Sequence, residues 1–262
     1  MIDLHNHTKL CGHAEGSPEE YIEEAIKKGF KYFGFSDHAP IAEAIRPGIT
    51  MHPDETEQYI EKIISLKAAY KDKIEILLGF EVDYPLFDDF NAEYFTDKRI
   101  DYFIGSCHFI DDWSVDSPES EKDYKRLDLN RIYTSYYEII IRLIESRLFN
   151  IVGHIDLPKK FGYPSTEDFS DIIKKIAEAA VKNDVAIEIN SAGLRKPVHE
   201  MYPSEKILEI LIKNKVKITF GSDSHYPDEA GSGYMEAEAL LKKYGCRKLS
   251  YFKKRTGYEL SI

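Results

Sequence analysis

Short apolar runs alternate with longer amphipathic segments along this chain. The short runs are rich in β-branched and aromatic residues, as is typical of strands, and they cover residues 2–7, 31–38, 74–82, 101–108, 150–156, 185–190 and 217–225. Strands that alternate with helices in this way favour a parallel sheet built from βα units. The hydrophobic pattern therefore predicts an α/β protein with seven strands.

Apolar residues recur at helical spacing in the longer segments. The predicted helices cover residues 17–29, 54–71, 129–147, 166–183, 203–215 and 233–245. The first has the clearest ends, because Ser17 can cap it, Pro18 suits its first position, Glu20 completes a capping box and Gly29 ends it. No linker, repeat or low-complexity segment interrupts the pattern, so we expect residues 1–262 to form a single domain.

Potential metal ligands lie at or just after the carboxyl end of almost every predicted strand. They are His5 and His7, Asp37 and His38, Glu81, His108, His154, and Asp223 and His225. In a parallel βα barrel these ends open onto one face, where side chains from distant parts of the sequence meet. The pattern predicts a barrel with a metal site at that face.

The spacing of these residues favours metal binding. Residues two apart on a strand point to the same side, so His5 and His7 can bind one ion, and so can Asp223 and His225. Imidazole and carboxylate ligands suit zinc, iron or manganese, and Glu81 can bridge two ions. Taken singly, a histidine after a strand is more often a hydrogen-bonded core residue than a ligand, so the prediction depends on the set.

Two further acidic residues are expected to orient ligands. Asp37 precedes His38 and points the other way if the strand continues, and Asp156 lies two residues after His154, where it either orients that ring or begins a loop. Four residues fit the pattern less well and are not expected to be ligands: Cys11, His52, Cys107 and His199.

Composition limits the partners. The chain has 262 residues, of which 43% are hydrophobic, enough for the core of one barrel. Its net charge of −11 disfavours nucleic acid and anionic membranes, so a small anionic substrate would need a locally positive site. The most apolar helical stretch is interrupted by Glu138 and Arg142, there is no secretory leader, and the three cysteines are few and odd in number. We expect free thiols and a cytoplasmic location.

The ordered motifs of the chain resemble those of the PHP (polymerase and histidinol phosphatase) family, and within it those of the histidinol-phosphatases. The motifs are HNH, CGHAEGS, FSDHAP, GFEVDY, GSCHF, GHIDL, EINSAGLRKP and GSDSH. The resemblance covers essentially the whole chain. It implies a distorted (β/α)7 barrel, related to the TIM barrel, with three divalent metal ions, most simply zinc, with iron or manganese as alternatives.

The resemblance also implies how nine ligands share these ions. The first ion would be held by His5, His7, Glu81 and Asp223, and Glu81 would bridge to a second ion held by His108 and His154. The third ion would be bound by His13, His38 and His225. Among these residues Asp223, His225 and Glu81 are the expected catalytic residues.

Clustered divalent ions suit the hydrolysis of a phosphate monoester. They lower the pKa of a bridging water, so that hydroxide forms near neutral pH, and they neutralise the phosphoryl oxygens. The chain has neither a GxSxG motif nor a P-loop. The leaving alkoxide could take its proton from Asp223, from a metal-bound water or from a nearby histidine.

A phosphate is best recognised by a guanidinium, which meets two oxygens at once. Arg195, just after the strand at 185–190, is the predicted phosphate ligand. Lys159 or Lys160 could supply a second cation, although either could equally be a solvated loop residue. Asn190 could touch the substrate or hold a loop.

The resemblance implies hydrolysis of L-histidinol phosphate to L-histidinol and inorganic phosphate, in histidine biosynthesis. One alternative is a PHP-type phosphoesterase that acts on mononucleotides or other phosphate monoesters. A second is an amidohydrolase-like enzyme, although one or two ions would then leave several histidines unused. A third is a metal-binding scaffold without activity. The expected partner is a small-molecule phosphate monoester, with no nucleic acid and no membrane.

Overall fold

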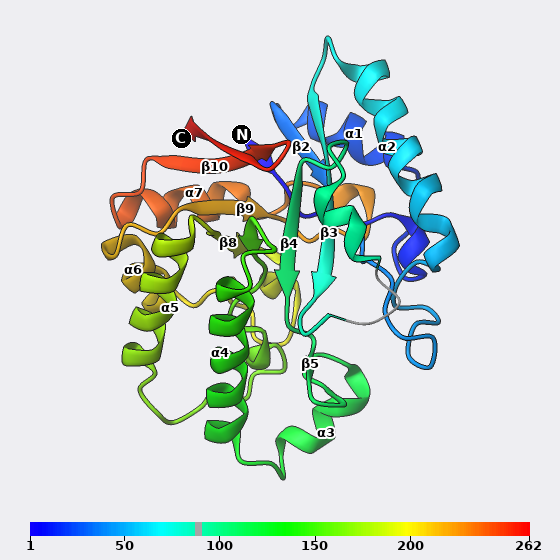
Figure 1. Ribbon diagram of the computed structural model, residues 1–262. Helices are drawn as coiled ribbons and strands as arrows, with labels where there is room; N and C mark the ends of the chain where they lie inside the picture. The colour runs from blue at the N-terminus through cyan, green and yellow to red at the C-terminus, as the bar shows by residue number, and fades with distance from the viewer. Residues whose placement is uncertain (87–90) are drawn as a thin grey trace.

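The computed structural model describes residues 1–86 and 91–262, and it contains a seven-stranded parallel sheet that curls into a nearly closed barrel (Figure 1). The strands follow one another in chain order: β1 (Ile2–Asp3), β2 (Tyr32–Phe35), β3 (Glu75–Asp83), β4 (Tyr102–Ser106), β7 (Ile151–Val152), β8 (Ala186–Asn190) and β9 (Ile218–Gly221). The predicted α/β barrel of the (β/α)7 type is therefore confirmed; six of its strands lie inside predicted apolar runs, and β3 extends one residue beyond its run, to Asp83.

Main-chain hydrogen bonds between the first and last strands complete the barrel. The amide of Leu4 donates to the carbonyl of Phe220 (3.0 Å), and beyond the strand ends Asp223 N donates to His5 O (2.8 Å). This seam brings together residues from the two ends of the chain, since 216 positions separate His7 from Asp223.

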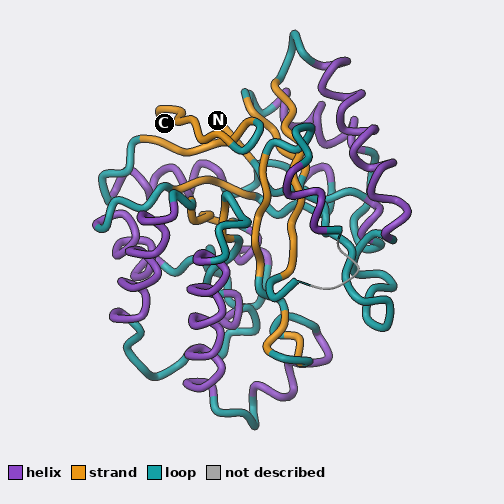
Figure 2. Tube along the Cα trace, viewed as in Figure 1, coloured by secondary structure: helices purple, strands orange, loops and turns teal. Residues whose placement is uncertain are grey.

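Helices cover the outside of the barrel (Figures 1 and 2). They are α1 (Pro18–Lys27), α2 (Thr56–Tyr70), α3 (Glu121–Tyr124), α4 (Leu129–Glu145), α5 (Ser170–Asn183), α6 (Glu205–Lys213) and α7 (Tyr234–Lys243). Short 3₁₀ helices occupy Lys9–Cys11, Pro53–Glu55, Ala92–Thr96, Pro118–Ser120, Leu157–Lys159, Ala192–Arg195 and Pro227–Glu229. The predicted helices are present, and the capping box of Ser17 and Glu20 forms at α1. Within 1–86 and 91–262, no helix is long and apolar enough to cross a bilayer.

A short excursion after β4 was not predicted. It consists of the hairpin β5 (Phe109–Ile110) and β6 (Trp113–Ser114), followed by α3, and it lies beyond the carboxyl ends of β3 and β4 (Figure 1). Strands of two residues are too short to show a periodic pattern. The excursion forms one wall of the cavity described below.

A second unpredicted hairpin, β10 (Lys248–Lys253) and β11 (Thr256–Ser261), ends the chain. Its two-residue turn places Lys254 and Arg255 at φ 48° and 67°, a conformation that favours Asn-Gly. Asp101, which directly precedes β4, accepts hydrogen bonds from both turn amides. These contacts stabilise a turn that its own residues do not favour, at the end of the barrel opposite to the carboxyl ends.

Tyr102 fills the barrel interior. Its neighbour on β3 is Gly79. Gly79 and Glu81 lie on the same, inward face of β3, because alternate residues of a strand share a face. A Cβ atom on Gly79 would lie 2.5 Å from the Tyr102 ring, so a larger residue there would clash. The Tyr102 hydroxyl donates to the carbonyl of Leu4 at 2.6 Å and thereby joins β4 to the segment that follows β1.

Tyr102→Phe is expected to lower the free energy of unfolding by about 1–3 kcal/mol, because it removes a hydrogen bond from a buried carbonyl that water does not reach. Urea denaturation of the metal-free protein would measure the change. Tyr258→Phe is the matched control: Tyr258 is 45% exposed, so its loss of a hydroxyl should change stability by no more than about 0.5 kcal/mol. Equal effects of the two substitutions would contradict the role given to Tyr102.

Candidate metal centre

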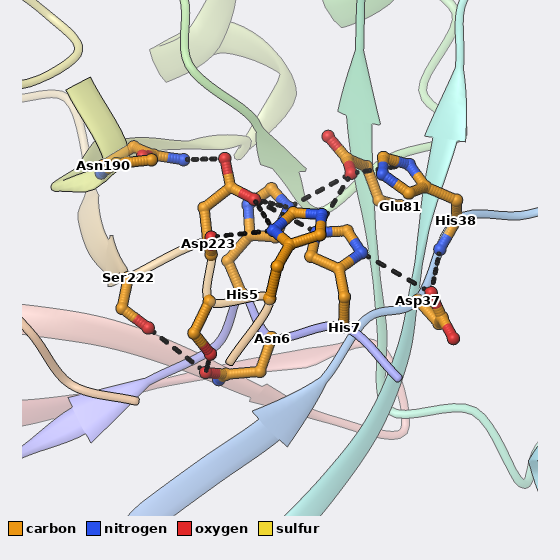
Figure 3. Close-up of polar contacts among 12 residues, drawn as sticks. His5, Asn6, His7, Asp37, His38, Glu81, Asn190, Ser222 and Asp223 are labelled. Carbon is orange, nitrogen blue, oxygen red and sulfur yellow. Dashed lines mark hydrogen bonds and ion pairs between the residues drawn. The ribbon is translucent and has the colours of Figure 1, made fainter. Parts of the chain in front are cut away.

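The predicted ligands converge at the carboxyl ends of the strands (Figure 3). His5 and His7 follow β1, His38 follows β2, Glu81 lies within β3, His108 follows β4, His154 follows β7, and Asp223 and His225 follow β9. His13 comes from the loop after the 3₁₀ helix Lys9–Cys11. The barrel topology thus gathers side chains that are widely separated in the sequence.

Glu81 lies at the centre of this group and is only 2% exposed. Its Oε2 atom lies 3.2 Å from Nε2 of His5 and 3.0 Å from Nδ1 of His38. Its Oε1 atom lies 2.9 Å from Nε2 of His154 and 3.5 Å from Nε2 of His108. Oε2 also lies 3.6 Å from Nε2 of His7. The two carboxylate oxygens therefore face different imidazoles, as a bridging carboxylate requires.

Several sets of three donor atoms lie within 4.8 Å of one another. They are His5, His7 and Glu81; Glu81, His108 and His154; His7, His38 and His225; Cys11, His13 and His225; and His7, Cys11 and Asp37. The first two sets match the groups expected for the first and second ions. The expected third group is divided, since no set among the described residues contains both His13 and His38. The Cys11 thiol, which was not expected to be a ligand, lies beside His13.

Asp223 has an unusual backbone conformation. Its φ of 52° lies in the left-handed region, which costs a residue other than glycine about 1–3 kcal/mol. Two contacts stabilise this backbone conformation. One is the hydrogen-bonded seam between the segment after β1 and the segment after β9, and the other is the guanidinium of Arg195, which donates to the Asp223 carbonyl at 3.1 Å. As a result Oδ1 of Asp223 lies 3.1 Å from Nε2 of His7 and 3.8 Å from Nε2 of His5.

Buried polar atoms that make no hydrogen bond indicate that the centre is a cation site. Nε2 of His5, Oε2 of Glu81 and Nε2 of His225 are all buried, and within the part of the chain that the structure describes they make no hydrogen bond. A buried polar atom left in this state costs about 1–3 kcal/mol. Imidazole nitrogens and carboxylate oxygens are the ligands that zinc, iron and manganese accept, so a divalent cation fits these atoms.

Carboxylates hold the opposite nitrogens of three of these rings. The pairs are Nδ1 of His7 with Asp37 (3.5 Å), Nδ1 of His108 with Asp83 (2.9 Å) and Nδ1 of His5 with Glu188 (2.8 Å). Such a carboxylate sets the tautomer and orientation of a ligating histidine. Asp37 was predicted in this role, whereas Asp83 and Glu188 were missed. Their positions in the sequence were the available signal. Asp83 lies two residues after Glu81 on β3, and Glu188 lies two residues before Asn190 on β8.

Asp156 does not orient His154. Its Oδ2 atom accepts a hydrogen bond from the amide of Ser204 (2.8 Å) and pairs with the ammonium group of Lys159 (3.0 Å). Strand β7 ends at Val152, so the alternation that would place residues 154 and 156 on one side does not continue. The chain turns instead into the 3₁₀ helix Leu157–Lys159, and Asp156 begins that loop.

A cavity of about 760 Å³ opens over the predicted ligands. One part of its wall consists of His13, His38, Glu81, His108, His154, Asp223 and His225. The excursion after β4 supplies another part, with Phe109, Asp112, Trp113, Asp116 and Glu119. The volume is within the range of small-molecule sites.

Two of the cations predicted to bind phosphate line this cavity. Arg195 donates from Nη2 to main-chain carbonyls and pairs through Nε with Glu229 (3.0 Å), while its Nη1 is buried and makes no hydrogen bond within residues 1–86 and 91–262. Lys160 pairs with Asp116 at 3.0 Å. Burial opposes ionisation of Asp116, but the charges of Lys160 and His108 hold the pKa of its carboxyl well below the usual value.

Lys159 and Asn190 do not line the cavity. Lys159 is buried, and its ammonium group is occupied by Asp156 and by Glu200 (2.8 Å). The amide of Asn190 donates to Oδ2 of Asp223 at 3.2 Å, as Figure 3 shows, so it holds a ligand rather than the substrate. For these two residues the structure favours a structural role over phosphate binding.

The rings differ in protonation without metal. Burial alone would lower the pKa of His7 and His108, but Asp223 and Asp37 raise that of His7 to about 9, and Asp83 and Glu81 raise that of His108 to about 10. Burial together with the charges of His38 and His7 lowers the pKa of His13 to about 4. Burial favours the neutral acid of Glu81, yet His5, His38 and His108 hold its pKa well below the ordinary value.

Comparisons with known proteins agree with this geometry. Residues 3–192 match the model of the PHP domain. A protein of Deinococcus radiodurans described as a probable histidinol-phosphatase is 31% identical over 96% of both chains. The histidinol-phosphatase of Bacillus subtilis is 30% identical over 92% of this chain and 98% of its own.

A solved structure shares the fold. The histidinol phosphate phosphatase of Lactococcus lactis, crystallised with zinc, L-histidinol and phosphate, superposes with a TM-score of 0.81 over 98% of each chain at 24% sequence identity. The similarity of the two chains in three dimensions agrees with the barrel described above.

Zinc binding to the metal-free protein is expected to release about two or more protons at pH 7, because the pKa values of His7 and His108 leave their rings protonated and a ligating imidazole must be neutral. For the same reason the apparent zinc affinity should rise with pH and level off between about 9 and 10. Calorimetry in buffers of different ionisation enthalpy measures both quantities. Binding that releases no protons and does not change between pH 6 and 9 would contradict these protonation states.

Proposed function

The chain belongs to the PHP domain family, and on this premise we propose that it is a histidinol-phosphatase, which hydrolyses L-histidinol phosphate to L-histidinol and inorganic phosphate in histidine biosynthesis. The observation that carries the proposal is the position of the Glu81 cluster at the floor of a cavity whose wall also contains Arg195 and Lys160. The names of the relatives from D. radiodurans and B. subtilis support the same activity.

We propose three divalent ions, most simply zinc, in the groups that the family resemblance implies. His5, His7, Glu81 and Asp223 would hold the first ion, Glu81, His108 and His154 the second, and His13, His38 and His225 the third. Two sets of donor atoms include Glu81, one with His5 and His7 and one with His108 and His154. Within each set the atoms are close enough to share one ion, which supports the positions of the first and second ions. The zinc in the L. lactis neighbour supports the choice of metal.

Ions bound there would lower the pKa of a water molecule and neutralise charge on the phosphoryl oxygens. The protein's own groups would then position the substrate. Arg195 can offer to a phosphate oxygen its Nη1, which makes no hydrogen bond to the part of the chain that the structure describes, and Lys160 adds positive charge to the cavity wall. Asp223 and His225 lie 3.7 Å apart beside the cavity, and we assign to them the uptake of a proton from the attacking water and its transfer to the leaving alkoxide.

The part of the cavity wall that the excursion after β4 supplies suits the organic part of this substrate. Asp112 and Glu119 are acidic and Trp113 is aromatic, a combination that favours an ammonium group and an imidazole ring. The additional phosphates of a nucleoside diphosphate or triphosphate would be repelled by the same carboxylates. This wall therefore favours histidinol phosphate over such a nucleotide.

We further propose that residues 1–262 act as one PHP metallophosphatase domain in the cytoplasm. Strand β9 lies beyond the residues matched by the family model, yet it closes the barrel and precedes Asp223 and His225. The three cysteines are free, which suits a reducing compartment.

Phosphate release from L-histidinol phosphate is the direct test. We expect a kcat/KM of about 10⁴ M⁻¹s⁻¹ or more, abolished by chelation and restored by zinc. Nucleotides and sugar phosphates, assayed in parallel, should be poor substrates. Preference for one of them would favour the broader phosphoesterase alternative. A fully metallated sample that releases no phosphate would refute the proposal and leave an amidohydrolase-like or scaffold role.

Arg195→Gln is expected to lower kcat/KM for histidinol phosphate by about 10-fold or more, because a half-buried guanidinium that meets a phosphate is worth at least one charge-assisted hydrogen bond. Steady-state kinetics and elemental analysis on the same sample would show whether metal is retained. Arg126→Gln is the control, since Arg126 is exposed and pairs only with Asp123 among the described residues. If both substitutions have an equal and small effect on kcat/KM, Arg195 does not bind the phosphate.

A further inference from the structure

We infer that Glu188 is a positioning residue that holds ligands of two different ions in place at the same time, an inference that rests on the proposed metal centre. Strand β8 is exceptional in the barrel, because it supplies none of the nine proposed ligands whereas each of the other strands leads into at least one. On its inward face β8 carries Glu188 and Asn190 instead. A strand without ligands therefore still faces the centre with two polar side chains.

The carboxylate of Glu188 is fully occupied. The residue is 1% exposed, and its Oε1 lies 2.8 Å from Nδ1 of His5. Its Oε2 accepts hydrogen bonds from the amide of His154 (3.1 Å) and from the side-chain amide of Asn190 (3.0 Å). That same amide of Asn190 donates to Oδ2 of Asp223 (3.2 Å). One carboxylate thus connects residues that follow β1, β7 and β9.

These contacts determine where the ligand atoms point. When Nδ1–H of His5 donates to Glu188, the lone pair of Nε2 is left free and faces Oε2 of Glu81 at 3.2 Å, where the first ion is proposed. The hydrogen bond from the His154 amide to Glu188 fixes the main chain of His154. The Nε2 atom of the same residue lies 2.9 Å from Oε1 of Glu81, where the second ion is proposed. Glu188 therefore acts on the metals through other residues and does not bind them itself.

The surrounding packing is shaped around this carboxylate. A Cβ atom on Gly221, in the neighbouring strand β9, would lie 1.8 Å from Oε1 of Glu188. Glycine at this position leaves the space that the carboxylate occupies. The length of the side chain also matters, because an aspartate is one methylene shorter and cannot reach the partners of both oxygens from the same backbone position.

A glutamine cannot replace Glu188 in this role. Three N–H groups, from His5, His154 and Asn190, converge on its two oxygens. A carboxylate accepts all of them, whereas an amide has one oxygen and places an NH₂ group against at least one donor. Either the His5 tautomer changes, which protonates Nε2, or the amide of His154 loses its partner.

The test is the zinc affinity of Glu188→Gln, measured ion by ion through competition with a chelator, with the bound zinc counted by elemental analysis. We expect the ions held by His5 and His154 to bind about 10- to 100-fold more weakly, with the affinity of the third ion unchanged. Asp101→Asn is the matched control: Asp101 is 4% exposed and accepts the amide of Leu78 (2.9 Å) at the opposite end of the barrel. It should lower the unfolding temperature without changing zinc affinity.

The outcomes separate this inference from the proposed function. If wild-type protein binds no zinc, the proposed metal centre fails. If wild-type protein binds zinc and Glu188→Gln binds every ion within about 2-fold of it, only the positioning role is refuted, and Glu188 is a structural carboxylate like Asp101. Should the glutamine variant not fold, Glu188→Asp decides, since it retains a carboxylate but shortens its reach. Zinc affinity equal to wild type in that variant would overturn the inference.

Discussion

The hydrogen bonds between β1 and β9 are the constraint on which the candidate site depends. They join the two ends of the chain, so that His5 and His7 lie beside Asp223. The same seam holds Asp223 in a left-handed conformation that its side chain does not favour. The seam also gives the two outermost strands of the sheet, β1 and β9, neighbours on both sides, although β1 has only two residues.

A centre built from buried imidazoles and carboxylates is costly until a cation occupies it. Glu81 offers both oxygens to five rings, and some of the buried donor and acceptor atoms have no hydrogen-bond partner among the described residues. The rings are held in this arrangement from behind, by Asp37, Asp83 and Glu188. These carboxylates orient the rings toward Glu81, which lowers the cost of ordering the side chains when an ion binds.

Much of this architecture was predictable from local patterns. The apolar runs located the seven strands, and the polar residues at their ends identified the members of the cluster that now surround Glu81. Other features were not predictable. The turn at Lys254 and Arg255 lacks the Asn-Gly signal and depends on Asp101, and the excursion after β4 is too short to show a period. For Asp156, Lys159 and Asn190 the sequence left a structural and a functional role open, and the contacts of each side chain favour the structural one.

By itself the sequence determined the fold class, the order of strands and helices, and which residues lie at the carboxyl ends of the strands, because periodicity and strand ends are local properties of the chain. Only the tertiary structure decided which donor meets which acceptor. Once a strand ends, alternation no longer sets the direction of a side chain, as Asp156 illustrates. The carboxylates Asp83 and Glu188 became recognisable as partners of His108 and His5 only when barrel closure placed them behind these rings, since strand alternation indicates which way they face but not which group they meet.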